Sequence, residues 1–182
     1  MIDIRLGLAI AAFLLGATPA AAQRIDSAYT RIDLKACQTI ESYELGASFS
    51  CPGYKGYPLY VAEDDSRMFV SYGFSAADEM AAHQTLPAFN TIGETLEWRL
   101  VESGNGWRPF ATILRFHTQS GDGSEPDGET LVVTSLAPGN TCHVAYVDAR
   151  LTPNANVVAR DFADGLAPVF DCARDEPARI PD

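Results

Sequence analysis

The sequence predicts an α+β fold in which an antiparallel, strongly curved sheet of about six or seven strands carries one main C-terminal helix and one short helix. Short apolar-alternating runs separated by turn residues are typical of antiparallel strands. One apolar stripe of helical period lies near the C-terminus. Four cysteines follow an export-like N-terminus, which indicates that disulfides hold the domain together.

Three β-hairpins are expected along the chain. The first pairs residues 57–61 with 68–74 across the polar turn 63–66, and a strand that ends at Cys51 precedes it. The second joins 96–100 to 107–117 across 103–106, where Asn105-Gly106 suits a tight turn because both positions tolerate positive φ. The third pairs 131–136 with 142–148 across 137–140.

Two helices are expected. The short one begins at Ser75, which forms a capping-box pattern with Asp78, and runs through about His83. The main helix begins at Thr152-Pro153, a capping residue followed by proline at the first helical position. Apolar residues then recur at helical spacing, which predicts that one face packs on the sheet: Ala155, Val158, Ala159, Phe162, Ala163 and Leu166.

Residues 1–22 are interpreted as a cleaved export signal. Arg5 precedes a short apolar run at 6–15, Pro19 follows it, and alanines at 20–22 supply a small-residue cleavage pattern. The run is too short to span a bilayer, so no stable membrane insertion is expected. We expect a periplasmic protein with a single disulfide-bonded domain at 23–174 and a flexible tail at 175–182.

The cysteines are Cys37, Cys51, Cys142 and Cys172. Three pairings are possible. We favour Cys37–Cys51 and Cys142–Cys172, because the second bond would join the return from the main helix to the strand before it. No C-x-x-C spacing supports zinc or thioredoxin-like chemistry, the histidines lack metal-binding spacing, and the acidic loop at 119–129 departs from the EF-hand pattern. No metal or cofactor is therefore expected.

The formal net charge of −11 results from 13 basic and 24 acidic residues. Nucleic acids are poor partners for such a chain because phosphate binding depends on lysine and arginine patches. A basic protein or another cationic ligand of the cell envelope is the expected class of partner, although the same charge also serves solubility.

One segment has the pattern of a serine-hydrolase nucleophile elbow. Gly73-Phe74-Ser75-Ala76-Ala77 reads G-x-S-x-A between a strand and a helix, and Asp122 and His143 follow in the order of that triad. The elbow needs a mainly parallel sheet, Ala77 replaces the expected glycine, and Ser75 already serves as a helix cap. Ser75 is therefore a weak catalytic candidate, and a small periplasmic serine hydrolase is the alternative function.

The stretch SFSCPGYKGYPLYV at 48–61 carries the candidate binding residues. Tyr57 shares a face with Leu59 and Val61, so it is expected in the core, whereas tyrosines outside that register are expected to be exposed. Rigid exposed tyrosines beside a lysine suit recognition of a protein or saccharide. In the other interpretation, this stretch is only the start of a hairpin that a disulfide holds in place, and its tyrosines have no role in binding. The predicted ligand-binding set is Tyr54, Lys55, Tyr60, Glu63, Asp64 and Asp65.

Three runs, CPGYKGYPLYVAEDDSRMFVSYG, TLPAFNTIGETLEWRL and LVVTSLAPGNTCHVAYVDA, resemble small exported bacterial proteins of no assigned activity. This resemblance implies a periplasmic setting and brings no catalytic residue with it. A fainter similarity in kind is to acidic, disulfide-bonded periplasmic lysozyme inhibitors. The expected function is a non-catalytic periplasmic binding or interaction module, and inhibition of a basic cell-wall hydrolase is one version of it.

Overall fold

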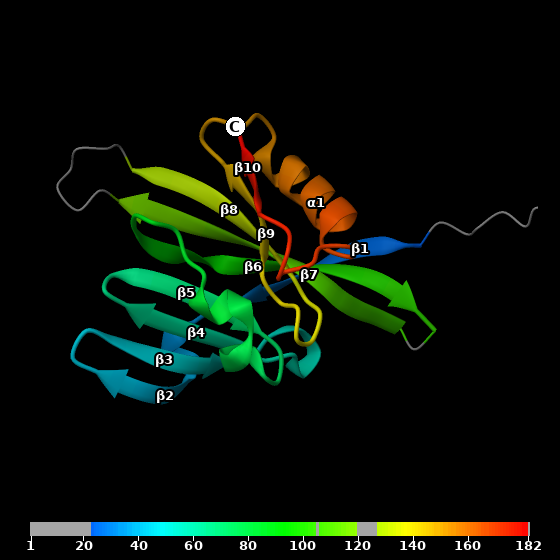
Figure 1. The fold of residues 1–182 in the computed structure, drawn as a ribbon. Coiled ribbons are helices and arrows are strands. Elements are labelled where there is room, and N and C mark those ends of the chain that lie inside the picture. The colour runs from blue at the N-terminus through cyan, green and yellow to red at the C-terminus, as the bar shows by residue number, and fades with distance from the viewer. Residues whose placement is uncertain (1–22, 105, 120–126, 182) are drawn as a thin grey trace, which may run out of the picture.

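The computed structural model describes residues 23–104, 106–119 and 127–181. In this part of the chain ten strands form two open sheets, and one α-helix lies on the larger sheet (Figure 1). The strands are β1 (Ile25–Arg31), β2 (Gln38–Tyr43), β3 (Gly46–Cys51), β4 (Leu59–Asp64), β5 (Arg67–Tyr72), β6 (Phe89–Ser103), β7 (Gly106–Gln119), β8 (Gly128–Ser135), β9 (His143–Asp148) and β10 (Ala178–Ile180). The helices are α1 (Ala155–Leu166) and the short 3-10 helices η1 (Leu34–Ala36), η2 (Tyr54–Gly56), η3 (Ala76–Asp78) and η4 (Met80–His83).

The molecule has three layers: α1, the six-stranded sheet β1-β6-β7-β8-β9-β10, and the four-stranded sheet β2-β3-β4-β5 (Figure 1). Side chains alternate across a strand, so each face of the large sheet contributes to a separate core. One core joins it to the small sheet and centres on Trp98, whose Nε1 donates a 2.8 Å hydrogen bond to Thr30 Oγ1. The other core lies under α1, where Ala159 and Ala163 are fully buried.

The mixed class of the fold is confirmed, but the prediction of one strongly curved sheet with six or seven strands is wrong. The three expected hairpins are present as β4–β5, β6–β7 and β8–β9, all antiparallel. The remaining strands depend on partners that alternation alone does not identify. Strand β1 pairs with β6 across a long sequence separation, with Ile25 opposite Val101, and β2 and β3 extend a second sheet.

The helices also differ from the prediction in detail. The main helix begins at Ala155, preceded by Asn154 in the left-handed conformation, rather than at Thr152-Pro153. The short helix is divided into η3 and η4, and the Ser75 side chain makes no capping hydrogen bond. Glu79 separates the two with an extended backbone, φ −81° and ψ 154°, because its carboxylate binds the turn between β8 and β9.

The C-terminal residues contribute a strand where a flexible tail is expected. Strand β10 pairs in parallel with β9, and the Arg179 guanidinium lies 4.7 Å from the centroid of the Tyr146 ring. This parallel pair is the exception to the expected antiparallel arrangement. Residues 1–22, the expected export signal, lie outside the described residues. Among the residues that are described, no helix has both the length and the apolar character needed to cross a membrane.

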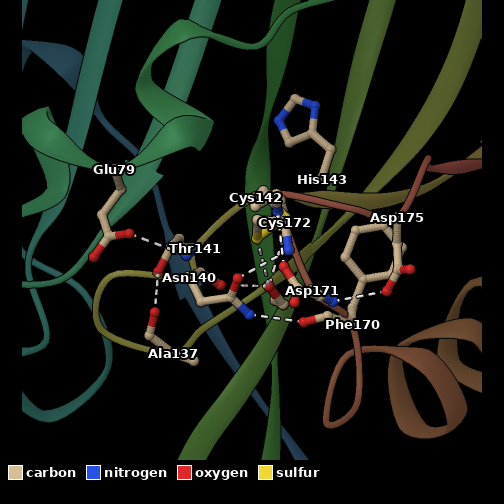
Figure 2. The surroundings of a disulfide bond; sticks show 12 residues. Glu79, Ala137, Asn140, Thr141, Cys142, His143, Phe170, Asp171, Cys172 and Asp175 are labelled. Atoms are coloured by element: carbon tan, nitrogen blue, oxygen red, sulfur yellow. Dashed lines mark hydrogen bonds between the residues drawn. A yellow bond between two sulfur atoms is a disulfide. The ribbon is translucent and has the colours of Figure 1, made fainter.

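Both predicted disulfides are present, Cys37–Cys51 and Cys142–Cys172. The second joins the start of β9 to the segment that returns from α1, as Figure 2 shows. Asn140 reinforces this junction: its side chain donates to the Phe170 carbonyl at 2.7 Å and accepts from the Cys172 backbone N–H at 2.9 Å. The turn between β8 and β9 is therefore fixed on the side that faces α1.

A charged network fixes α1 on the large sheet. Arg99 on β6 forms a two-point contact with Asp164 on α1, with N···O distances of 2.8 and 2.6 Å. Glu97, two residues earlier, accepts from Arg160 on α1 at 2.6 and 3.1 Å and from Ser27 Oγ at 2.6 Å. Each buried charge on β6 thus has a partner of opposite sign on the helix, as burial of ions requires.

Candidate functional site

The candidate site is the face of the four-stranded sheet that points away from the core. Phe49, Val61 and Val70 lie opposite one another and face the core, so the alternate residues of the same strands face outward. Small residues form the centre of this surface, with Ser50 opposite Tyr60 and Ser48 opposite Ala62. We call it the outer face and define it by Ile40, Glu41, Tyr43, Tyr60, Asp64 and Phe69.

Large apolar side chains are exposed on the outer face. Ile40 is 57% exposed and Tyr43 is 47% exposed, and both belong to the edge strand β2. Tyr60 and Phe69, on β4 and β5, are half-buried. The strands hold these side chains beside small residues, of which Ser48 and Ala62 are buried, so the surface between the rings is shallow. Such a surface suits contact with another macromolecule.

The outer face is acidic as well as aromatic. From residue 38 to residue 72 the chain has five acidic and two basic residues, and one of the bases, Arg67, forms a 2.7 Å ion pair with Asp65. The pKa of Tyr43 lies above its ordinary value, first through desolvation and then through the neighbouring groups Asp64, Tyr60, Glu41 and Glu63. Tyrosine and carboxylate groups are therefore close together on this surface.

The structure does not bring the predicted ligand-binding residues together on one surface. Tyr60 and Asp64 lie on the outer face, whereas Glu63 alternates with them on the side of Val61, opposite Met68, with an exposed side chain. Asp65 occupies the β4–β5 turn with φ 47°. Tyr54 and Lys55, in contrast, lie in η2, before β4 begins.

Tyr54 differs from its prediction because it packs against the core. It is half-buried, and its ring centroid lies 6.3 Å from that of Trp98. Lys55 lies beside it, with Nζ 5.3 Å from the Tyr54 ring centroid. Tyr57, predicted in the core, is half-buried and makes an edge-on contact with Trp98 at 5.8 Å. The η2 segment therefore serves chiefly to close the core beside the Cys37–Cys51 disulfide.

Sequence reasoning missed the part of the site that β2 provides. Ile40, Glu41 and Tyr43 lie on a strand that was not predicted, although Gly46 at the end of YELG marks the turn into β3. A register shift between Thr39 and Glu41 interrupts the simple alternation. This bulge hides the two-residue period from inspection of the sequence.

A cleft of about 980 Å³ adjoins the outer face, beyond the end of β5. A smaller hollow of about 220 Å³, with Tyr60 and Ile40 in its lining, lies between the cleft and the outer face. Gly73 and Phe74 line both. Phe74 is 90% exposed and separates the two hollows.

The far wall of the cleft is the turn between β8 and β9, and Glu79 holds it in place. Its two carboxylate oxygens accept from the backbone N–H groups of Gly139 at 2.7 Å and Thr141 at 3.0 Å, and Glu79 and Thr141 appear together in Figure 2. The Ala81 backbone N–H also donates to the Thr141 carbonyl at 3.0 Å. The cleft is thus a preformed feature of the fold.

The residues of the alternative hydrolase triad are not joined. Ser75 is exposed and lines the cleft, whereas His143 is 1% exposed, and its Nδ1 lies 2.9 Å from the Tyr146 hydroxyl. Burial lowers the pKa of His143 to about 3, so its imidazole is neutral at pH 7. The third member, Asp122, lies outside the described residues.

Neither a search for metal sites nor a comparison with known proteins assigns a function to the chain. Within residues 23–104, 106–119 and 127–181, no cluster of three histidine, cysteine or acidic side chains could hold a metal ion. Comparisons of the chain with protein-family models, curated proteins and solved structures return no match. The outer face and the adjoining cleft are therefore the features from which a function is inferred.

Proposed function

We propose that the protein is a non-catalytic binding module of the bacterial periplasm, and that its outer face binds a cationic protein of the cell envelope. A basic cell-wall hydrolase, which the module would inhibit, is the version with the clearest test. The observation that carries the proposal is the combination of one exposed and two half-buried rings with exposed carboxylates on one sheet face.

This combination suits a basic protein surface for two physical reasons. Tyr43, Tyr60 and Phe69 bury a large area on contact and lose little conformational entropy, because aromatic side chains have few rotatable bonds. Glu41 and Asp64 lie beside these rings, where they can pair with lysine or arginine side chains of the partner. Arginine also stacks on aromatic rings, so one partner residue can use both features.

An affinity capture tests the proposal. The mature, oxidised protein is immobilised and exposed to an envelope extract at low and at high salt, beside an immobilised Glu41→Gln/Asp64→Asn variant. We expect a stoichiometric basic partner on the wild-type protein, less of it on the variant, and its release by salt, because exposed charges are screened as ionic strength rises.

Two results would contradict the proposal. Capture that is the same at both salt concentrations would remove the electrostatic basis of the interaction. Capture of nothing from a complete envelope extract would remove the binding function itself, since the immobilised protein then has no partner of the stated class.

A further inference from the structure

The cleft beside Phe74 is lined by large apolar side chains that do not belong to the outer face. Phe74 is 90% exposed, the highest value among the exposed large apolar side chains of the described residues. Its ring centroid lies 6.4 Å from that of Tyr57, which lines the same cleft. Met80, also in the lining, is 43% exposed. Three large apolar side chains thus border one accessible hollow.

Gly73 sets the position of the Phe74 ring. Its φ of +107° is strained for residues with a side chain, and it turns the chain out of β5 just before Phe74. A Cβ at this position would lie 3.4 Å from the Tyr57 hydroxyl. The backbone therefore directs Phe74 outward and leaves the Tyr57 hydroxyl free of a covering side chain.

Two carboxylates line the cleft, together with the imidazole of His83. Asp78 is exposed, and Glu79 contributes a second carboxylate, although both of its oxygens already accept backbone hydrogen bonds. Neither lysine nor arginine is among the lining residues, which all belong to the described part of the chain. Rings beside an accessible carboxylate form a favourable site for an organic cation, since the ring faces and the carboxylate both attract positive charge.

We infer that the cleft is a receptor pocket for an arginine side chain of the cationic partner. The guanidinium lies against Phe74 and Tyr57 and pairs with Asp78, while the aliphatic stem packs on Met80. Charge complementarity selects this occupant over a purely apolar segment, because Asp78 supplies an accessible carboxylate at the rim, beside the exposed side chains of Ser75 and His83. This inference rests on the proposed function, as it identifies the anchor by which the same partner is held.

A peptide titration tests the pocket directly. Hexa-arginine is titrated into the mature protein at low salt and compared with hexa-citrulline, its uncharged isostere. We expect binding of hexa-arginine only, and an affinity loss of about fivefold or more in Phe74→Ala, because that variant removes a cation–π contact and leaves the charge unchanged. Asp78→Asn is expected to weaken binding to a similar degree.

Matched variants separate the pocket from the general acidity of the protein. Leu151→Ala removes an apolar side chain that is 69% exposed, and Asp161→Asn removes an exposed charge from α1. Equal effects of Phe74→Ala and Leu151→Ala, or of Asp78→Asn and Asp161→Asn, would overturn the inference. Binding of hexa-citrulline as strong as that of hexa-arginine would also overturn it, in favour of an uncharged ligand.

The two proposals fail in different ways. If a basic partner binds and depends on Glu41 and Asp64 but not on Phe74 or Asp78, the pocket inference is wrong and the proposed function stands. If no basic partner binds in the envelope capture, the proposed function is wrong, whatever the peptide shows.

Discussion

Burial decides what the histidines of this chain can do. His143 is 1% exposed, and its pKa of about 3 results from desolvation, which disfavours the charged ring. His83, in contrast, is exposed in the cleft. The sequence shows both as isolated histidines, and only the packing of β9 separates a structural residue from an accessible one.

His143 should make the fold sensitive to acid. The pKa of His143 is lowered in the folded state. The imidazole is therefore protonated near pH 6.5 in the unfolded chain, but only near pH 3 in the folded protein. Stability is therefore lost as pH falls from 6.5 towards 3, by up to about 1.4 kcal/mol per pH unit. Denaturant unfolding at several pH values should show that His143→Gln removes this slope. An identical pH slope in the variant and the wild type would contradict the assignment, and His83→Gln serves as the control.

At the scale of elements, local patterns were sufficient for some features and not for others. The three hairpins and α1 follow from alternation, turn residues and a helical stripe within short windows. Strands β1 and β10 depend on partners far along the chain or on a parallel edge, which no short window contains. The bulge in β2 hides the strand that carries Ile40, Glu41 and Tyr43. Phe69 on β5 was not predicted either, so four of the six residues that define the outer face escaped prediction.

The contact between α1 and β6 gives a prediction at this scale. The Arg99 side chain is 10% exposed, and Asp164 on α1 is its closest charged partner, at 2.6 Å. Asp164→Ala would leave this guanidinium without that partner in a mostly buried position, and we expect a loss of about 2–4 kcal/mol in the free energy of unfolding. Urea denaturation measures the change.

The matched control lies on the same helix. Asp161 is exposed, so Asp161→Ala should change stability by less than about 0.5 kcal/mol. Equal losses in Asp164→Ala and Asp161→Ala would show that the Arg99 contact does not fix the helix on the sheet.

At the scale of the whole molecule, the two sheets differ in how their faces are used. The large sheet has α1 on one face and the small sheet on the other, so both of its faces are used by the two cores. The small sheet keeps an outer face with exposed rings and carboxylates. The net charge of −11 favours encounter with cations in general, whereas the proposed function assigns their binding to the outer face.

The central claim is that this particular face, and not total charge, binds the partner. The most direct measurement is a calorimetric titration of a basic lysozyme into three forms of residues 23–182: wild type, Glu41→Gln/Asp64→Asn, and Asp161→Asn/Glu176→Gln. The last two have the same net charge, and Asp161 and Glu176 are exposed outside the outer face. We predict an affinity about tenfold lower for the outer-face variant and near the wild-type value for the control. Equal affinities of the two double variants, or no binding to the wild type, would contradict the account.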